Sequence, residues 1–284
     1  CADDIKTDNL GNLIVFKKGK KSAKSKLMVS AHMDEVGLMV TDITSDGYLK
    51  FDEVGGIDRR VLPGKRVCVG RNGFNGVIGV KPIHLTNSDE KTAVPKMNDM
   101  YIDIGAESRE DALKYVNYGD GINFEGGFKI NGKTVVTKAL DDRFGCYVLI
   151  NLIKSEPEYD MYFTFVVQEE VGLRGARPAA FTVNPDFALV IESTTAADVA
   201  EVDASHQVCN LSKGATVTVM DRATVYDKEM ISAAFELAEK NNIAVQYKRA
   251  VAGGNDSGAI HQSRGGVRTL AVSLPSRYIH APST

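Results

Sequence analysis

One segment decides the fold: Tyr162-Phe-Thr-Phe-Val-Val-Gln-Glu-Glu-Val-Gly-Leu-Arg-Gly-Ala176. Its first six residues are all aromatic or β-branched, which is typical of a buried strand. Two adjacent carboxylates, Glu169 and Glu170, follow this run, and Gly172 and Gly175 then predict a sharp turn. In open α/β sheets, ligands bind beyond the carboxyl ends of the strands, so the two acids lie where a site is expected.

Two neighbouring carboxylates repel each other, so leaving both of them charged without a cation nearby costs free energy. A metal ion held by one glutamate, with the other acting as a proton shuttle, accounts for both residues. The alternative is a solvated Glu-Glu pair at the end of a strand. The segment alone does not decide between these interpretations, so the rest of the chain has to.

The composition indicates a soluble globular protein of one or two domains, with 284 residues and a net charge of -3. This charge argues against nucleic acid as the main partner, and no apolar run approaches the ~18 residues that span a bilayer. The chain lacks an initiator Met and ends four residues after His280, so we expect a fragment or an incompletely observed chain. Four scattered cysteines without a CxxC pair favour a reducing, cytoplasmic location: Cys1, Cys68, Cys146 and Cys209.

A second apolar strand, residues 26–31, ends at His32, and Asp34 follows two residues later. In an extended segment these two side chains face the same side. Imidazole is the commonest ligand of borderline metals, and a carboxylate on its other nitrogen fixes the tautomer. The alternative is a histidine satisfied by a backbone carbonyl. Before this strand, residues 17–26 contain six lysines and no aromatic residue, which favours a solvated hairpin loop over a nucleic-acid patch.

The pattern of apolar and polar residues changes between residues 37 and 127. Short alternating runs recur between glycine turns, and one helix is predicted from Ser108, as N-cap, to Asn117. Many short strands with one helix indicate a small β-barrel or PDZ-like module. Such a module could itself be the functional part, binding peptides by strand addition. His84 lies in this segment, and we assign it a structural or surface role.

More acids and a histidine occur at element ends in the remaining sequence. Asp141 and Asp142 precede an apolar helix; one of them suffices as a cap, and the other is a candidate to bridge two cations. The apolar run 186–191 ends on Glu192, and the last strand, 269–274, is followed by His280. A glycine loop with Asp256 inside it leads into a further helix.

Together these residues indicate a metal centre. The carboxyl ends of strands in a doubly wound sheet share one edge, so the polar residues that follow them can converge. Two histidines with several carboxylates and no thiol do not fit a closed structural zinc site. They fit two divalent ions that share a carboxylate, ~3.5–4 Å apart.

Five motifs, in this order along the chain, resemble those of the M42 metallo-aminopeptidases: His32-x-Asp34, Ala139-Leu-Asp141-Asp-Arg, Glu169-Glu-Val-Gly-Leu-Arg-Gly-Ala176, Gly253-Gly-Asn-Asp256 and Arg277-Tyr-Ile-His280. These are tetrahedral, self-compartmentalising peptidases, whose relatives include glutamyl aminopeptidases and proteins once labelled endoglucanases. The resemblance implies an α/β catalytic domain at residues 1–36 and 128–284, with a central mixed sheet flanked by helices. It also implies that a PDZ-like dimerisation domain at residues 37–127 interrupts this domain, and that dimers assemble into a dodecamer.

The resemblance further implies a role for each matching residue, with two divalent ions. The ligand types favour zinc or cobalt and also allow manganese. Asp141 is then the bridging ligand, Glu169 the general base that takes a proton from water, and Asp34 the partner of His32. The remaining ligands would be His32 and Glu192 at one ion, and Glu170 and His280 at the other. The chain would remove N-terminal residues from peptides.

The sequence departs from the family pattern at several points. Glu192 stands where the family often has Asp, Asn255 where Thr is common, and Ala281 where Ser is frequent. The N-terminal helix and C-terminal tail that the family usually carries are missing. Two alternatives to an aminopeptidase remain open: a related metal-dependent deacylase or other hydrolase, and a non-enzymatic scaffold that binds peptides through the middle module. A glycosidase is weaker, since no pair of acids is placed as one.

Overall fold

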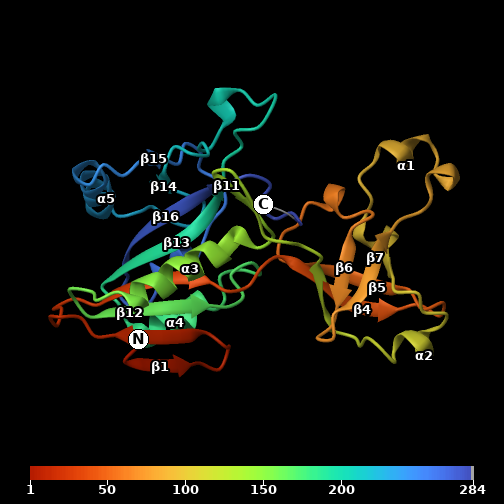
Figure 1. Ribbon diagram of the computed structural model, residues 1–284, viewed down its shortest axis with the longest axis horizontal. Coiled ribbons are helices and arrows are strands. Elements are labelled where there is room, and N and C mark those ends of the chain that lie inside the picture. Colours follow the sequence, from red (N-terminus) through yellow and green to blue (C-terminus); the bar gives the residue numbers. More distant parts are fainter. Residues whose placement is uncertain (283–284) are drawn as a thin grey trace. The chain divides into compact units, whose positions relative to one another are not determined.

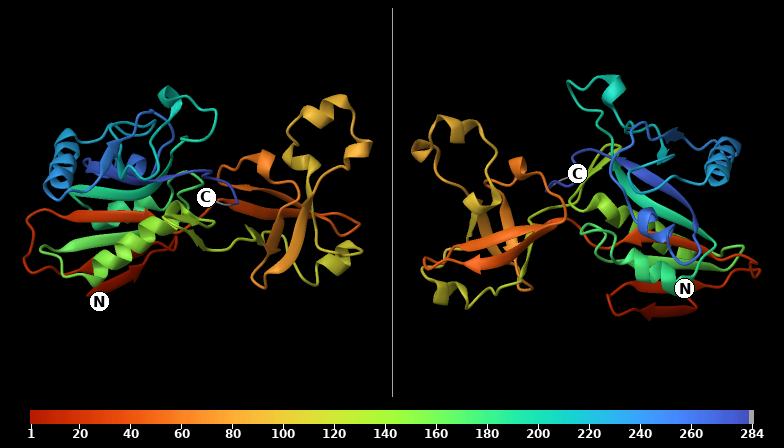
Figure 2. Two further views of the ribbon diagram at one scale, coloured as in Figure 1. Left: turned by 45° about the horizontal axis from the view of Figure 1, so that its top comes forward. Right: turned by 180° about the vertical axis from the view of Figure 1, so that it is seen from behind.

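The computed structural model describes residues 1–282, which form two compact units (Figures 1 and 2). The first unit contains Cys1–Glu35 and Leu140–Ile279, and the second contains Val36–Ala139 with residues 280–282. A large mixed sheet with helices in one unit and a small closed barrel in the other confirm the predicted fold class. The insertion expected at residues 37–127 lies inside the second unit, which continues to Ala139. Among the described residues, no helix has the length and apolar character that a membrane span requires.

The first unit is built on one eight-stranded sheet with the order β1-β2-β12-β3-β13-β16-β14-β15. The central strands β12, β3, β13 and β16 are mutually parallel, so their carboxyl ends meet at one edge. Antiparallel pairing of β2 with β12 and of β14 with β16 makes the sheet mixed. The strands are β1 (Asp4–Thr7), β2 (Leu13–Lys17), β3 (Leu27–His32), β12 (Met161–Val166), β13 (Phe187–Thr195), β14 (Ala215–Val217), β15 (Val245–Tyr247) and β16 (Arg268–Ser276).

Helices cover both faces of this sheet, which explains why most side chains of the central strands β3 and β13 are buried on either face. Successive side chains of β3 point to opposite faces: Met28 packs in the core with α4 and α6, whereas Val29 packs against α3. Helix α5 belongs to the same layer as α4 and α6. The helices of this unit are α3 (Leu140–Lys154), α4 (Ala176–Val183), α5 (Lys228–Lys240) and α6 (Ser257–Ile260), with a 3₁₀ turn η4 (Ala204–His206).

Two details of the predicted strands were wrong. The lysine-rich connection at residues 17–26 is not a hairpin, because β12 lies between β2 and β3 in the sheet. Glu192 does not end its strand, because β13 continues to Thr195 through its pairing with β16. Its side chain is nevertheless buried, at 6% exposure.

A buried asparagine fixes the turn that follows β12. The Asn12 side chain accepts a hydrogen bond from the Val167 N–H at 2.9 Å and donates one to the Gly175 carbonyl at 2.9 Å. Asp8 accepts a second bond from the same amide at 2.6 Å. A Cβ at Gly175 would lie 2.1 Å from the Val167 carbonyl oxygen, so only glycine leaves room for this closure. The turn between these two residues carries Glu169 and Glu170.

The second unit contains a closed antiparallel barrel with the order β4-β5-β8-β7-β6-β9. Its interior is filled by fully buried side chains such as Ile43, Leu49 and Ile102. The first and last strands of the barrel pair with each other, Leu38 opposite Ile122. The strands are β4 (Gly37–Ile43), β5 (Leu49–Val54), β6 (Arg66–Val69), β7 (Phe74–Gly79), β8 (Tyr101–Asp103) and β9 (Gly121–Phe124), and a separate hairpin follows, β10 (Lys129–Asn131) and β11 (Thr134–Val136).

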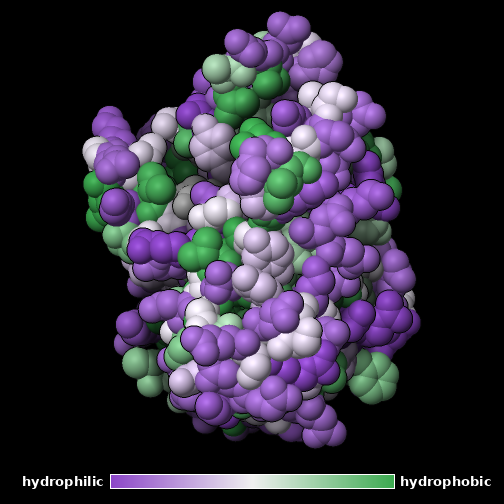
Figure 3. All heavy atoms as spheres, turned by 90° about the vertical axis from the view of Figure 1, so that its right-hand side faces the viewer, coloured by the Kyte–Doolittle hydropathy of each residue, from purple (hydrophilic) through white to green (hydrophobic). Residues whose placement is uncertain are grey.

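Short helices decorate the barrel strands. Helix α2 (Arg109–Ala112) begins after Ser108 as predicted, with the Ser108 hydroxyl accepting a bond from the Asp111 N–H. It ends five residues before the predicted Asn117, because the chain then tightens into three-residue turns such as Lys114 N–H to Asp111. Four further short helices were not predicted: α1 (Ser88–Thr92), η1 (Arg59–Val61), η2 (Ile83–Leu85) and η3 (Met97–Asp99). Figure 3 shows mainly hydrophilic side chains on one face of the molecule, with apolar side chains scattered between them.

We predict that Asn12→Ala destabilises the protein by about 1–3 kcal/mol, since it leaves the half-buried Val167 N–H without its partner and removes one of the two hydrogen bonds that the Gly175 carbonyl accepts. Urea unfolding followed by circular dichroism measures this change. Asn151→Ala is the matched control, because its exposed amide bonds only within α3, to the Tyr147 carbonyl. The control should change stability by less than about 0.5 kcal/mol. Equal effects of the two substitutions would contradict the role given to Asn12.

Candidate metal centre

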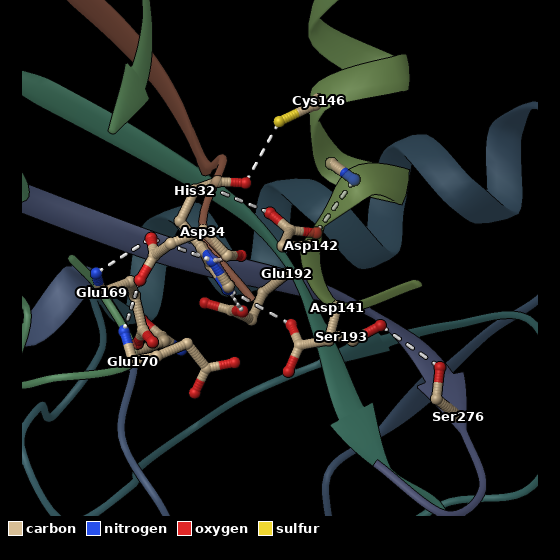
Figure 4. Close-up of polar contacts among 12 residues, drawn as sticks. His32, Asp34, Asp141, Asp142, Cys146, Glu169, Glu170, Glu192, Ser193 and Ser276 are labelled. Carbon is tan, nitrogen blue, oxygen red and sulfur yellow. Dashed lines mark hydrogen bonds and ion pairs between the residues drawn. The ribbon is translucent and has the colours of Figure 1, made fainter. Parts of the chain in front are cut away.

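Three of the predicted ligands meet at the carboxyl edge of the sheet (Figure 4). His32 is the last residue of β3, Asp141 lies in the first turn of α3, and Glu192 lies in β13. The His32 Nε2 is 3.3 Å from Asp141 Oδ1 and 3.3 Å from Glu192 Oε1. One donor atom from each of the three residues lies within 4.8 Å of the others.

The His32 ring is held through its other nitrogen. Nδ1 lies 3.0 Å from the backbone carbonyl of Asp34 and 3.6 Å from its carboxylate. The predicted partner is therefore present, but its carbonyl is the closer acceptor. A proton on Nδ1, donated to this carbonyl, leaves the Nε2 lone pair directed at Asp141 and Glu192.

The Asp34 carboxylate instead orients the Glu-Glu pair. It accepts hydrogen bonds from the backbone N–H groups of Glu169 and Glu170, each at 3.1 Å (Figure 4). Donor atoms of His32, Glu169 and Glu170 form a second group within 4.8 Å. Asp34 thus connects the histidine strand to the glutamate turn. These contacts hold Asp34 as an anion: burial alone would raise its pKa, but His32 and the two N–H groups lower it.

The centre concentrates acids in a buried place. Burial raises the pKa of Glu169 to about 10, and the charges of Glu192 and Asp256 add to this effect. Burial also raises the pKa of Glu192 well above its usual value, although His32 opposes the shift. Burial lowers the pKa of His32, but its contacts with Asp141, Asp34 and Glu192 outweigh this and raise it. Each of these shifts would be reversed by positive charge at the centre.

The residues present fit a divalent cation. The buried His32 Nε2 and Glu192 Oε2 make no hydrogen bond within the described chain. Burying such groups without a partner costs free energy, and a bound cation is the partner that imidazole and carboxylates share. The donor set of nitrogen and oxygen atoms suits zinc, cobalt or manganese.

The remaining predicted ligands lie as follows. Glu170 is in the glutamate turn described above, where its backbone N–H donates to the Asp34 carboxylate. His280 directly follows Ile279, the last residue of the first unit, and belongs by its contacts to the second unit. Its assignment to an ion therefore stays a prediction. His84 is exposed in the second unit, in keeping with the surface role given to it.

Two buried acids near the centre were given no firm role by the sequence. Asp142 is fully buried, and its carboxylate accepts bonds from the backbone N–H groups of His32 and Gly145. Asp256 is also fully buried, and neither of its carboxylate oxygens makes a hydrogen bond in the described chain. Burial raises the pKa of Asp256 to about 7, with Asp34, Asp141 and Glu170 among the charges that act on it. The sequence contains one signal for Asp256, because this residue lies in a glycine-rich loop that leads into a helix.

The family model described as M42 glutamyl aminopeptidase matches residues 11–284. The chain belongs to the M42 peptidases. It is therefore a peptide hydrolase of the aminopeptidase class, as the motifs predicted.

Several relatives of this M42 peptidase share most of its length. It is 44% identical over 99% of its residues to a protein of Acetivibrio thermocellus named as an aminopeptidase, covering 83% of that protein. It is 34% identical to the lysyl aminopeptidase of Pyrococcus furiosus, covering 99% of this chain and 81% of the relative. A TET aminopeptidase from a marine sediment archaeon superposes with a TM-score of 0.94 at 34% identity, covering 99% and 81% of the two chains.

We predict that the M42 peptidase freed of metal by a chelator becomes less stable as pH rises. The folded state raises the pKa of Glu169 from 4.5 to about 10, so it binds this proton more tightly than the unfolded state. Such a group stabilises the fold fully below the unfolded pKa, and the stabilisation is lost as pH rises toward the folded pKa. The Tm in chelator should therefore fall between pH values of about 5 and about 9, and added Zn²⁺ should reverse the fall.

Glu169→Gln should flatten this fall, because the amide does not titrate. Glu239→Gln, on the exposed side of α5, should leave it unchanged. Scanning calorimetry over the pH range makes the comparison. If the Tm in chelator does not depend on pH, the fold does not raise the pKa of Glu169.

Proposed function

We propose that this M42 peptidase is a dinuclear aminopeptidase in which Glu169 is the general base. The observation that supports this most is the convergence of His32, Asp141 and Glu192 at the edge of the sheet, with Glu169 in the next turn. We assign His32 and Glu192 to one ion, Glu170 and His280 to the other, and Asp141 to both. Zinc or cobalt are the ions that we favour, with manganese a further possibility.

When bound, the ions would lower the pKa of water and polarise the scissile carbonyl. Glu169 would take a proton from the attacking water and transfer it to the leaving amine. Asp34 contributes by holding the backbone N–H groups of Glu169 and Glu170, which fixes the direction of both side chains. The turn is held from its other side by Asn12, so the base is anchored by residues that flank β2 and β3.

We further propose a cytoplasmic homo-oligomer that acts on peptides. A TET1 peptidase of Pyrococcus horikoshii that can assemble into a tetrahedron or an octahedral shell matches with a TM-score of 0.84 at 38% identity. The second unit is then the natural dimerisation module. Strand addition to the barrel is disfavoured, because its six strands form a closed ring.

We predict that Glu169→Gln retains both ions yet lowers kcat by about 10²–10⁴-fold, because it removes only the proton acceptor. Aminoacyl anilides report the rate, and elemental analysis of the purified protein reports the ions. Glu239→Gln is the control and should retain full activity. A Glu169→Gln variant with unimpaired turnover would mean that the base is assigned to the wrong residue.

We predict that Asp141→Asn loses metal as well as rate, since a bridging carboxylate serves both ions. Isothermal titration with Zn²⁺ should show weaker binding of both ions rather than one. Two ions bound with unchanged affinity would refute the bridging role.

The alternative of a deacylase is tested with substrates that differ only at the N-terminus. An aminopeptidase should cleave the free aminoacyl anilide and leave its N-acetyl form uncut. A preference for the acetylated substrate would instead support the deacylase.

A further inference from the structure

The backbone of His32 is held by the first turns of α3. Its N–H donates to Asp142 Oδ2 at 3.3 Å, and its carbonyl accepts a bond from the Cys146 thiol at 3.1 Å (Figure 4). The pairing of β3 with β13 stops at Ser30 opposite Val190. Beyond this point α3, rather than that neighbouring strand, supplies hydrogen-bond partners to the His32 backbone.

Both partners on α3 are themselves buried and fixed. Asp142 is 0% exposed, and its second carboxylate oxygen accepts a bond from the Gly145 N–H at 2.9 Å. A Cβ at Gly145 would lie 2.3 Å from Asp142 Oδ2, so glycine is needed for the carboxylate to reach the strand. Cys146 is 9% exposed and packs in the core between α3 and the sheet.

The same helix also carries Asp141, whose carboxylate lies 3.3 Å from the His32 Nε2. The first turns of α3 therefore contact the ring of His32 at one side and its backbone at two points. Among the described residues, neither Asp142 nor Cys146 belongs to a group of acids and imidazoles that could hold an ion. Their contacts with His32 serve its position and not coordination.

We propose that Asp142 and Cys146 are positioning residues, which clamp the His32 backbone so that its Nε2 stays in reach of the ion shared with Asp141 and Glu192. This inference rests on the proposed metal centre but not on the identity of the substrate. Groups that orient a metal ligand typically contribute 10–100-fold to metal affinity, so a loose clamp should weaken one ion selectively.

The test compares three single substitutions in α3, with Zn²⁺ titrated into the metal-free protein by calorimetry. Cys146→Ala removes the thiol donor and should weaken one of the two ions by about 10-fold. Cys146→Ser keeps a donor and should restore the affinity to within about 3-fold of the unaltered protein. Asp142→Asn keeps one acceptor oxygen but replaces the other with a donor, and should weaken the same ion by about 10–100-fold.

Leu149→Ala is the matched control for packing. Leu149 is fully buried one turn further along α3 in the same core, and its aliphatic side chain has no group that could donate a hydrogen bond to the His32 backbone. It should lower Tm at least as much as Cys146→Ala while leaving both ion affinities within about 2-fold. The absorption spectrum of bound Co²⁺ should change for Cys146→Ala and not for Leu149→Ala.

Two results would overturn the clamp. One is a Cys146→Ala variant that binds both ions as tightly as the unaltered protein. The other is equal loss of affinity in Cys146→Ala and Leu149→Ala, which would assign the effect to general packing. Cys146→Ala decides the question if Asp142→Asn does not fold. Failure of the unaltered protein to bind any divalent ion would instead refute the proposed metal centre, and the clamp with it.

Discussion

Electrostatic repulsion at one edge of the sheet is the constraint on which the rest of the first unit depends. Parallel strands bring Glu192 and the turn after β12 to the same edge, and the start of α3 adds Asp141. At this depth the acids cannot be screened by solvent, so their mutual repulsion is stronger than on a surface. A structure that keeps these acids together must therefore fix the backbone around them by other interactions.

The hydrogen bonds around the centre provide this support, and each of them joins segments far apart in the sequence. Asn12, which directly precedes β2, bonds to both ends of the glutamate turn. Asp34 ties the end of β3 to the backbone of the same turn. Asp142 ties α3 to β3. These hydrogen bonds from several parts of the sheet together offset the free-energy cost of placing the acids side by side. A divalent cation would remove much of that cost.

Much of this arrangement could be predicted from sequence because residue type and position agreed. His32 and the Glu169–Glu170 pair follow apolar strands, and parallel strands necessarily share an edge. The extension of β13 past Glu192 could not be predicted, since it depends on pairing with β16. A short helix such as α1 depends on its cap, here two reciprocal hydrogen bonds between Asn87 and Glu90, and five residues leave little periodicity to detect.

The backbone contacts of His32 were beyond the reach of sequence for a different reason. Asp142 bonds a main-chain N–H 110 positions away, and every residue except proline carries that group. When two side chains bind each other, both residue types in the sequence indicate the contact. When a side chain binds backbone, only its own residue type does. Asp142 therefore looked like an ordinary helix cap.

The pairing of β4 with β9 has a consequence for how such a chain can arise. The barrel begins and ends on adjacent strands, so the host chain enters and leaves it at points about 5 Å apart. The barrel is thus equivalent to a long loop between two residues that are close in space. A gene could gain, lose or exchange the barrel in one insertion without altering the register of the strands that carry the acids.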